Sequence, residues 1–324
     1  MAESTVHPPS KALVAQPTLS HRLRASATAL LFLLPAAALV ITFFIVPVII
    51  TLYISMTDMS TSTFSDPNFI GLQNYSRMFR SGAMGKIVRN TVFYVGTTLA
   101  LFNVGMALVI ALLTTHIPRR SGAFFRALWL LPRITPSVVY IMIWKYLAAD
   151  APFGVFNQVL QPLGIAPENW VLAAPWTMVI LVNGFIGASF GMIIFTSAIE
   201  SIPESYLHAS RVDGATALQT IRYVILPLLR WPLLFVMTYQ TLSLMTSFEQ
   251  ILLLTDGGPG YYTTETWALQ AYHRALSNYF GNVNFGLGAA LAAVLVLIGV
   301  ILAIVYLRVF RFGELVQEPK IETL

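Results

Sequence analysis

The sequence predicts an all-α fold, a polytopic bundle of about six transmembrane helices. Of its 324 residues, 56% are hydrophobic and only 10% are charged, whereas a soluble domain carries charge on about a quarter of its residues. Several apolar runs exceed the roughly 18 to 20 residues that are needed to cross a hydrocarbon core. A half-polar, regularly patterned segment, residues 203–229, lies between two of these runs. We therefore expect an integral membrane protein with one distinctive segment outside the bilayer.

The sequence predicts six spans. The spans cover residues 27–55, 88–115, 125–148, 175–199, 231–255 and 285–307. The first span is too long for the core of a signal peptide and no small-residue cleavage site follows it, so we interpret it as a retained anchor. Residues 27–311 are expected to form the transmembrane domain, with a disordered tail at 1–26 and a short C-terminal tail at 312–324.

The distribution of positive charge predicts the orientation in the membrane. Lys and Arg accumulate in cytoplasmic loops of membrane proteins. If the N-terminus lies in the cytoplasm, most of the 19 Lys and Arg residues fall in cytoplasmic segments. Both termini are therefore expected inside, and residues 203–229 lie in the cytoplasm between spans four and five.

Composition and motifs exclude several kinds of chemistry. The chain has no cysteine, which excludes disulfides, thiolate metal sites and cysteine nucleophiles. We expect no metal site, no cofactor and no nucleic-acid partner. No G-x-x-x-x-G-K-[ST] phosphate-binding loop is present, and the nearest string, GAMGK at Gly82, has the wrong spacing. The chain is not expected to be an enzyme or to bind ATP through that motif.

The segment 203–229 is predicted to form two short helices with a break at Asp213-Gly214. Glycine suits the left-handed conformation that ends a helix, and Thr216 is placed to cap the next one. Pro227 then stops or kinks the second helix near the membrane.

The second helix carries an apolar stripe at helical spacing. Its members are Ala215, Leu218, Ile221 and Ile225. Two interpretations of this stripe remain open on the pattern alone. It can lie on lipid headgroups as an interfacial helix, or it can dock into a groove on a cytoplasmic partner.

The same segment resembles the coupling motif of permease subunits of binding-protein-dependent ABC importers. That pattern reads EAA, three residues, Gly, nine residues and I-x-L-P, and the match includes its spacing in the sugar-importer form. The matching residues are Ala209, Asp213, Gly214, Ala215, Leu226 and Pro227. Three positions differ from the pattern: His208 replaces Glu, Ser210 replaces the second Ala, and Val224 replaces Ile.

Three further stretches resemble the maltose-type and glycerol-phosphate-type permeases of this family. FIGLQNYSRMF at residues 69–79 is similar to their first outside loop, and GVFNQVLQPLGI at 154–165 to the loop after span three. LLTDGGPGYYTTET at 253–266 is similar to the loop after span five. The resemblance covers residues 27–311 in the expected order.

The resemblance implies a permease subunit of an inner-membrane ABC importer for a sugar or related polyol. It implies four partners: two nucleotide-binding ATPase subunits, a second and non-identical permease, and an extracytoplasmic solute-binding protein. The ATPase-coupling residues it implies are His208, Ala209, Ser210, Asp213, Gly214, Ala215, Leu226 and Pro227. Because His208 replaces the family's Glu, the ion pair of that Glu with the ATPase subunit is in doubt, and two interpretations stay open: His208 donates a hydrogen bond there, or it is an exposed loop histidine with no role.

A polar stripe in span five is the first candidate for the substrate path. Gln240, Ser243, Ser247 and Gln250 fall within an arc of roughly 80° if the helix is continuous. They can bond sugar hydroxyls, or they can bond a neighbouring helix. Asn183 in span four is a further candidate. On that span, Gly187 and Gly191 form a small-xxx-small pair, which indicates close helix packing.

Arg133 lies about nine residues into predicted span three, and a charge at that depth is a functional candidate. It can face the cavity and attract an anionic substrate, or it can pair or extend to the inner headgroups. Residues 257–260 form an outside turn, which either only connects two elements of the chain or contributes to docking of the binding protein.

Two other classes of protein compete with the permease interpretation. An ion-coupled secondary transporter of a small polar solute needs ionisable residues at mid-membrane, usually within repeated halves, and the sequence offers few candidates and no visible repeat. A structural or assembly protein needs neither the patterned cytoplasmic segment nor the polar stripe.

Overall fold

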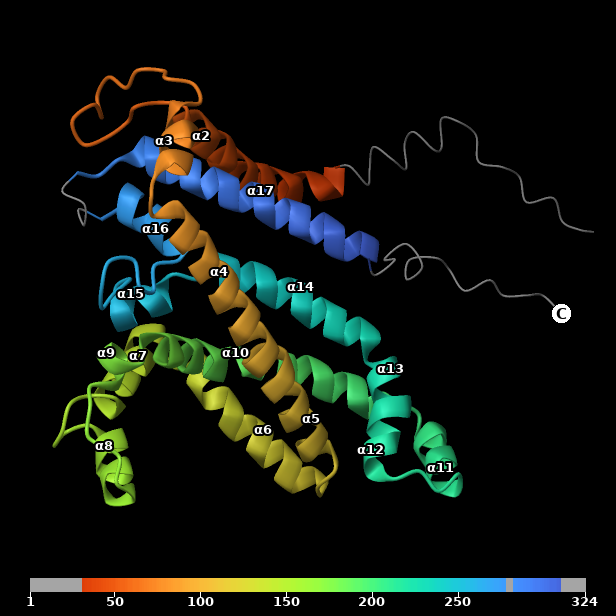
Figure 1. The fold of residues 1–324 in the computed structure, drawn as a ribbon. Helices are drawn as coiled ribbons and strands as arrows, with labels where there is room; N and C mark the ends of the chain where they lie inside the picture. Colours follow the sequence, from red (N-terminus) through yellow and green to blue (C-terminus); the bar gives the residue numbers. More distant parts are fainter. Residues whose placement is uncertain (1–30, 278–281, 310–324) are drawn as a thin grey trace, which may run out of the picture. The chain divides into compact units, whose positions relative to one another are not determined.

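A computed structural model describes residues 31–277 and 282–309 of the chain (Figure 1). The described residues are helical apart from connecting loops and one isolated antiparallel bridge between Thr57 and Phe69. The chain divides into two compact units, residues 1–50 and 51–324. The tails predicted at 1–26 and 312–324 lie outside the described residues.

The described part of the first unit, residues 31–50, belongs to a helix that runs from Leu31 to Ser55. It contains a π-helical turn, η1 (Ile41–Ile45), followed by α2 (Val46–Ser55). The helix carries no charged side chain and is apolar on every side. Such a helix suits a lipid environment or a neighbouring membrane helix.

The described chain contains four straight candidate spans, or up to six when each bent helix pair is counted as one. After the first helix, the straight spans are α4 (Met84–Thr98) continued by η2 (Leu99–Met106) and α5 (Ala107–Thr115), then α10 (Pro175–Glu200) and α17 (Phe285–Val309). The bent pairs are α6 (Arg119–Ile134) with α7 (Ser137–Leu147), at 100°, and residues 217–228 with α14 (Arg230–Thr246), at 68°. This agrees with the predicted all-α, polytopic fold.

Spans three and five were predicted as continuous helices, and both predictions were wrong. The first breaks at Thr135, whose ψ of 136° is extended, because the residue before a proline is driven away from the helical region. The second ends at Thr246. Ser247 is extended, with ψ 119°, and a separate helix, α15 (Glu249–Thr255), follows.

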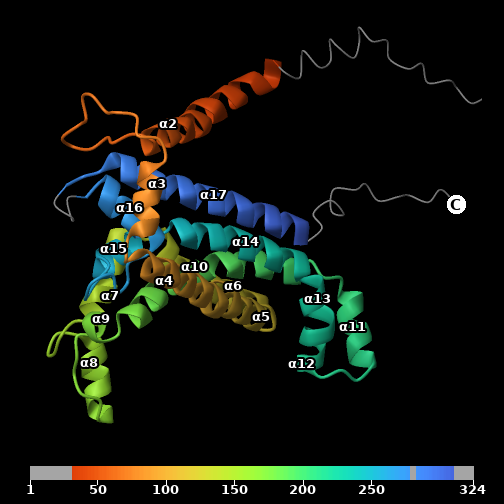
Figure 2. The same cartoon turned by 45° about the horizontal axis from the view of Figure 1, so that its top comes forward.

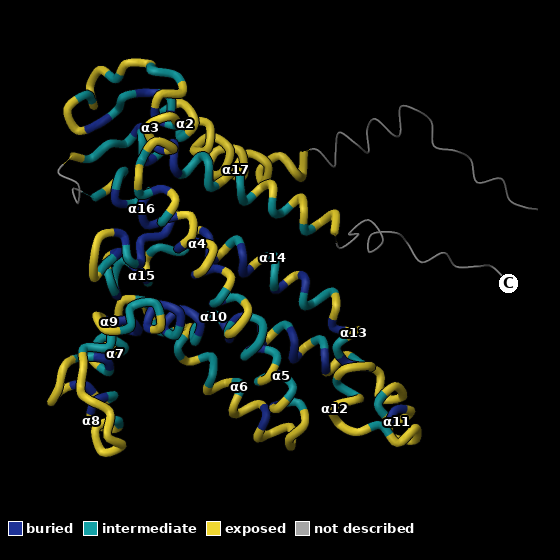
Figure 3. The backbone as a smooth tube through the Cα atoms, viewed as in Figure 1, coloured by how far each residue is buried: buried dark blue, intermediate teal, exposed yellow. Residues whose placement is uncertain are grey.

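Helix α10 is the central element of the second unit. It packs against α4, η2, α5, α6, α14 and α15, and buried residues follow its length (Figure 3). Glycines permit this close packing: a Cβ on Gly187 would lie 2.2 Å from Asn103 Oδ1, and one on Gly191 would lie 2.4 Å from the Asn103 carbonyl oxygen. The small-residue packing predicted from Gly187 and Gly191 is confirmed.

The short helices gather at two opposite ends of the second unit (Figures 1 and 2). One end, here called the loop end, holds α3 (Gln73–Arg80), α8 (Val155–Leu160), η3 (Gln161–Leu163), α9 (Trp170–Ala173), α15 and α16 (Trp267–Ala275). The other, the hairpin end, holds α11 (Glu204–Val212), α12 (Ala217–Thr220), η4 (Ile221–Ile225) and α13 (Leu226–Leu228).

The stretch FIGLQNYSRMF has a structural role at the loop end. Asn74 in α3 is fully buried, and its Nδ2 donates to the carbonyl oxygens of Ser55 at 2.9 Å and Thr57 at 2.7 Å. The Tyr75 hydroxyl lies 2.7 Å from Ser55 Oγ. Because the last carbonyls of a helix lack intrahelical partners, these bonds cap the end of α2.

The glycine packing on α10 gives a stability prediction. Gly191→Ala should lower the free energy of unfolding by about 1–3 kcal/mol, since its methyl group would overlap the Asn103 carbonyl and a backbone shift is needed. Gly96→Ala in α4 is the matched control, because a Cβ there meets nothing within 4 Å. Thermal unfolding in detergent measures both. Equal midpoints for the two variants would contradict the packing described for α10.

Candidate functional site

The segment after α10 folds into a helical hairpin, residues 203–229, whose turn is built as the sequence predicts. Gly214 has φ +73°, and its N–H bonds the Arg211 carbonyl while the Ala215 N–H bonds the Ser210 carbonyl. This is the Schellman arrangement that closes a helix. Thr216 then starts α12 with a capping box, its side chain and that of Gln219 bonding each other's backbone N–H groups. Both the break and the cap are confirmed.

The base of the hairpin is anchored in the helix bundle. Ile225 and Leu229 are each 1% exposed and belong to one apolar cluster with Phe195 and Ile199 of α10. Between its two arms, Ser210 is buried, and its Oγ lies 3.4 Å from Thr220 Oγ1. A movement of the hairpin base therefore has to involve the end of α10, because close-packed side chains transmit displacement.

The tip of the hairpin exposes apolar side chains. Val212 is 87% exposed and Leu218 75% exposed, and Tyr206 and Tyr223 are exposed as well. The stripe predicted on the second arm is thus divided, with Ile225 buried in the bundle and Leu218 presented outward. An exposed apolar patch of this kind marks an interaction surface.

The other predicted coupling residues are mostly accessible. His208 is exposed, and its Nε2 lies 3.8 Å from Glu204 Oε2 one helical turn away, a surface contact of little energetic weight. Ala209, Asp213, Gly214 and Pro227 are exposed, whereas Ala215 and Leu226 are half-buried. Ser210 differs from them, since it packs inside the hairpin.

A polar network lies where span five breaks. Asn183 of α10 donates through Nδ2 to Ser247 Oγ at 3.1 Å and also to the hydroxyl of Tyr94 from α4. Ser247 Oγ in turn donates to Gln250 Oε1 at 2.6 Å. Three of the predicted path residues, Asn183, Ser247 and Gln250, are therefore brought together. Sequence reasoning missed Tyr94, which lies among other polar residues of predicted span two and carries no distinguishing local signal.

The remaining predicted path residues lie elsewhere. Gln240 is buried and donates to the Gly187 carbonyl at 2.9 Å, which is a contact between helices. Ser243 is exposed on α14. Arg133 is exposed at the end of α6, with its guanidinium 5.6 Å from the centre of the Phe190 ring, a cation–π distance. The four residues predicted on one arc of span five do not form one stripe, because the helix ends at Thr246.

The two broken spans are also joined to each other. Ser137 at the start of α7 donates to Glu249 Oε1 at the start of α15, at 2.5 Å. Sequence reasoning did not predict Ser137, and this bond gives Glu249 a structural role. The network itself contains only hydroxyl and amide groups, so its chemistry is hydrogen bonding rather than proton or metal chemistry. Among the described residues, no group of three or more metal-ligating side chains is placed to hold a metal ion.

The arrangement defines a class: a polytopic helical membrane protein with broken spans and an anchored hairpin at one end. Residues 103–312 match the family described as binding-protein-dependent transport system inner membrane component. A probable ABC transporter permease protein of Sinorhizobium fredii is 34% identical over 78% of this chain and 81% of its own length. The chain belongs to this family, and it is a membrane transport component.

Further relatives extend the comparison. The trehalose/maltose transport system permease protein of Thermococcus litoralis is 28% identical, covering 87% of this chain and 93% of its own. The sulfoquinovosyl glycerol transport system permease protein of Agrobacterium fabrum is 29% identical over 87% and 90% of the two chains. The crystal structure of a bacterial ABC transporter that imports alginate superposes with a TM-score of 0.75 at 20% identity, over 90% of this chain and 98% of the other, and shares the fold.

Proposed function

We propose that this chain is a permease subunit of an ABC importer that moves a sugar or related polyol across the cytoplasmic membrane. The observation that carries the substrate class is the composition of the network at the break in span five. Tyr94, Asn183, Ser247 and Gln250 present hydroxyl and amide groups, which match the hydroxyls of a neutral carbohydrate. The relative named for trehalose/maltose supports the same class, and the relative named for sulfoquinovosyl glycerol supports a sugar-containing substrate.

The driving force comes from partners at the hairpin end. Two nucleotide-binding ATPase subunits hydrolyse ATP, and one of them receives the exposed tip around Leu218 and Val212. A second, similar permease completes the membrane pair as a heterodimer. A solute-binding protein delivers substrate at the loop end, which then lies outside the cell, with both termini in the cytoplasm.

The geometry supports a mechanical link between the hairpin and the network. The hairpin base packs on Phe195 and Ile199 of α10, and Asn183 lies on the same helix. When the ATPases close, a shift of the hairpin moves α10 as a rigid element. Asn183 then moves relative to Ser247, and the network opens so that substrate hydroxyls can replace its internal bonds.

The alternative of an ion-coupled secondary transporter does not fit the family to which the chain belongs, and no observation favours it. Such a transporter places ionisable groups at mid-membrane. Arg133 is exposed, and its guanidinium lies over the Phe190 ring. Arg126 pairs with Glu200 at 3.2 Å at the hairpin end. Neither contacts the network.

The proposal is tested by ATP hydrolysis in the assembled transporter. The complex that copurifies with this chain is reconstituted in lipid with its binding protein and exposed to neutral sugars, polyols and polyol phosphates. Stimulation by a neutral sugar or polyol is expected. Stimulation by polyol phosphates alone would indicate that Arg133, rather than the polar network, recognises the substrate. A preparation without an ATPase subunit and without hydrolysis would contradict the proposal.

Gly214 tests the coupling role of the hairpin. Gly214→Ala places a Cβ at positive φ, which costs roughly 1–2 kcal/mol, and should lower substrate-stimulated ATP hydrolysis on the order of tenfold. Gly164→Ala is the matched control: it also has positive φ, +82°, with nothing within 4 Å of a Cβ, but lies at the loop end. Equal loss in both variants, or none in Gly214→Ala, would count against coupling through the hairpin.

Tyr94 tests the substrate path. Tyr94→Phe removes one hydrogen-bonding group and should raise the KM for transport roughly 2- to 10-fold, since a hydrogen bond contributes about 0.5–1.5 kcal/mol. Tyr140→Phe is the control. Its buried hydroxyl donates to the Val182 carbonyl at 2.9 Å, so its loss should lower stability without changing KM. A shift in KM for Tyr140→Phe alone would refute the assignment of the network.

A further inference from the structure

A buried histidine lies between two carboxylates at the loop end. His273 of α16 is 1% exposed. Its Nδ1 lies 2.9 Å from Glu265 Oε1 and its Nε2 lies 3.0 Å from Asp256 Oδ1. Glu265 is itself buried, whereas Asp256 is exposed. These three residues, here called the His273 clamp, lie outside the candidate spans.

The two contacts suit a protonated ring, which donates from both nitrogens. A neutral imidazole has one N–H donor and one acceptor nitrogen, so it can donate to only one of two carboxylates. The imidazolium of His273 donates to both Glu265 and Asp256. It also supplies the charge that buried Glu265 needs, because a buried carboxylate without a partner is strongly destabilising.

The surroundings of the clamp support this charge state. Burial disfavours the charged ring, but hydrogen bonds and charge from Glu265 and Asp256 outweigh it, and the pKa of His273 is raised. Burial also raises the pKa of Glu265, although His273 opposes this. The Gln270 side chain of α16 also contacts the clamp, in the amide orientation that satisfies both its nitrogen and its oxygen. In that orientation the nitrogen lies 2.9 Å from Glu265 Oε1, and the oxygen lies 3.1 Å from Arg274 Nε.

Few other charged groups face the clamp. From α4, Lys86 donates to the Tyr261 carbonyl at 2.7 Å, and in the loop itself burial raises the pKa of Tyr262 to about 12. The α15 carboxylate of Glu249 is bonded to Ser137. The described parts of α14 and α17 bring no charged side chain to this end.

The clamp closes the two ends of one loop. Asp256, with φ 50°, ends α15, and Glu265 directly precedes α16. Between them the Thr264 N–H bonds the Gly257 carbonyl at 3.0 Å, and Thr264 Oγ1 donates to the Gly258 carbonyl at 2.8 Å. The result is a compact loop at 257–264 whose tip, Tyr261, is 78% exposed.

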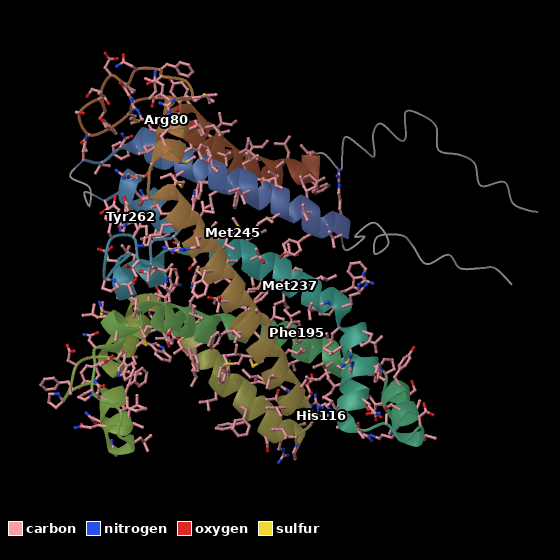
Figure 4. All side chains as sticks on the ribbon, in the orientation of Figure 1. Arg80, His116, Phe195, Met237, Met245 and Tyr262 are labelled. Atoms are coloured by element: carbon pink, nitrogen blue, oxygen red, sulfur yellow. The ribbon has the colours of Figure 1, made fainter. Side chains whose placement is uncertain are left out.

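The loop also rests on α4 and shapes the surface beside it. Asn90 Nδ2 donates to the carbonyls of Tyr262 and Glu265, each at 3.0 Å, and Figure 4 shows Tyr262 at this end beside α16. A cavity of about 330 Å³ borders the loop, and its lining includes Pro259, Thr255, Lys145 and Asn169.

We propose that His273 is a positioning residue that, as an imidazolium, holds the loop 257–264 in the shape that presents Tyr261 and shapes this cavity. The hold is present at lower pH and is lost as the pH rises through the pKa of His273, because the neutral ring leaves one carboxylate facing a nitrogen lone pair. Its consequence for transport rests on the proposed function: the loop then faces outside, and docking of the binding protein weakens at alkaline pH.

The test is a spin label at the loop tip. Because the chain has no cysteine, Tyr261→Cys gives a single labelling site in this chain, which is assembled with partner subunits whose own cysteines are replaced. Label mobility is followed over a pH series that begins below the ordinary histidine pKa and extends well above it, because the pKa of His273 is raised. Phe153→Cys, an exposed site in the loop between α7 and α8, is the control for general unfolding.

Glu265→Gln is the decisive second variant. Its amide can donate to a neutral ring nitrogen, so one N–H toward Asp256 satisfies the cluster and no imidazolium is needed. We expect the label at position 261 to become several-fold more mobile at high pH in the native background and to lose that transition with Glu265→Gln. Unchanged mobility in the native background, the same transition with Glu265→Gln, or the same transition at position 153 would each overturn the inference. These readouts do not depend on the substrate or on ATP.

Discussion

The structure depends on one constraint: polar groups in a bilayer must find partners within the protein. Two spans are interrupted, at Thr135 and at Ser247, and each interruption would leave backbone and side-chain groups without helical partners. Polar side chains at the two breaks find partners on other elements: Ser137 bonds Glu249 across the two spans, and Asn183 of α10 bonds Ser247. The break at Ser247 thus adds hydrogen-bonding groups to the buried polar side chains of the bundle, which is the feature that a permease needs along its path.

Helix α10 connects that cluster to the hairpin. Its first half carries Asn183, and its second half carries Phe195 and Ile199, on which the hairpin base packs. Glycines on the intervening face bring it against η2 so closely that added methyl groups would overlap. A close-packed helix of 26 residues moves as one body, so the same packing that stabilises the bundle links its two functional regions. At the loop end, the His273 clamp fixes the surface in a similar way, by charge rather than by apolar packing.

Local chemistry predicted the hairpin well and the polar centre only in part. Gly214 and Thr216 determine the hairpin turn through their own conformational and capping preferences, which are visible in the sequence. Span five contains neither glycine nor proline near Ser247, so nothing local marks its break, where Ser247 is bonded by Asn183 from another helix. The predicted arc therefore holds only in part, because Ser247 and Gln250 join the network while Gln240 and Ser243 lie on α14 away from it. The His273 clamp joins residues 8 and 17 positions apart, and only the folded loop brings them together.

The most direct measurement is photo-crosslinking from position 218 in intact cells, with a photoreactive amino acid replacing Leu218 at the hairpin tip. Leu163, which is similarly exposed but lies at the loop end, provides the comparison. The account predicts that position 218 crosslinks to a nucleotide-binding ATPase subunit and that position 163 does not. A crosslink to that subunit from position 163, or crosslinks from position 218 to lipid alone, would contradict the proposed role of the hairpin and the proposed orientation of the chain.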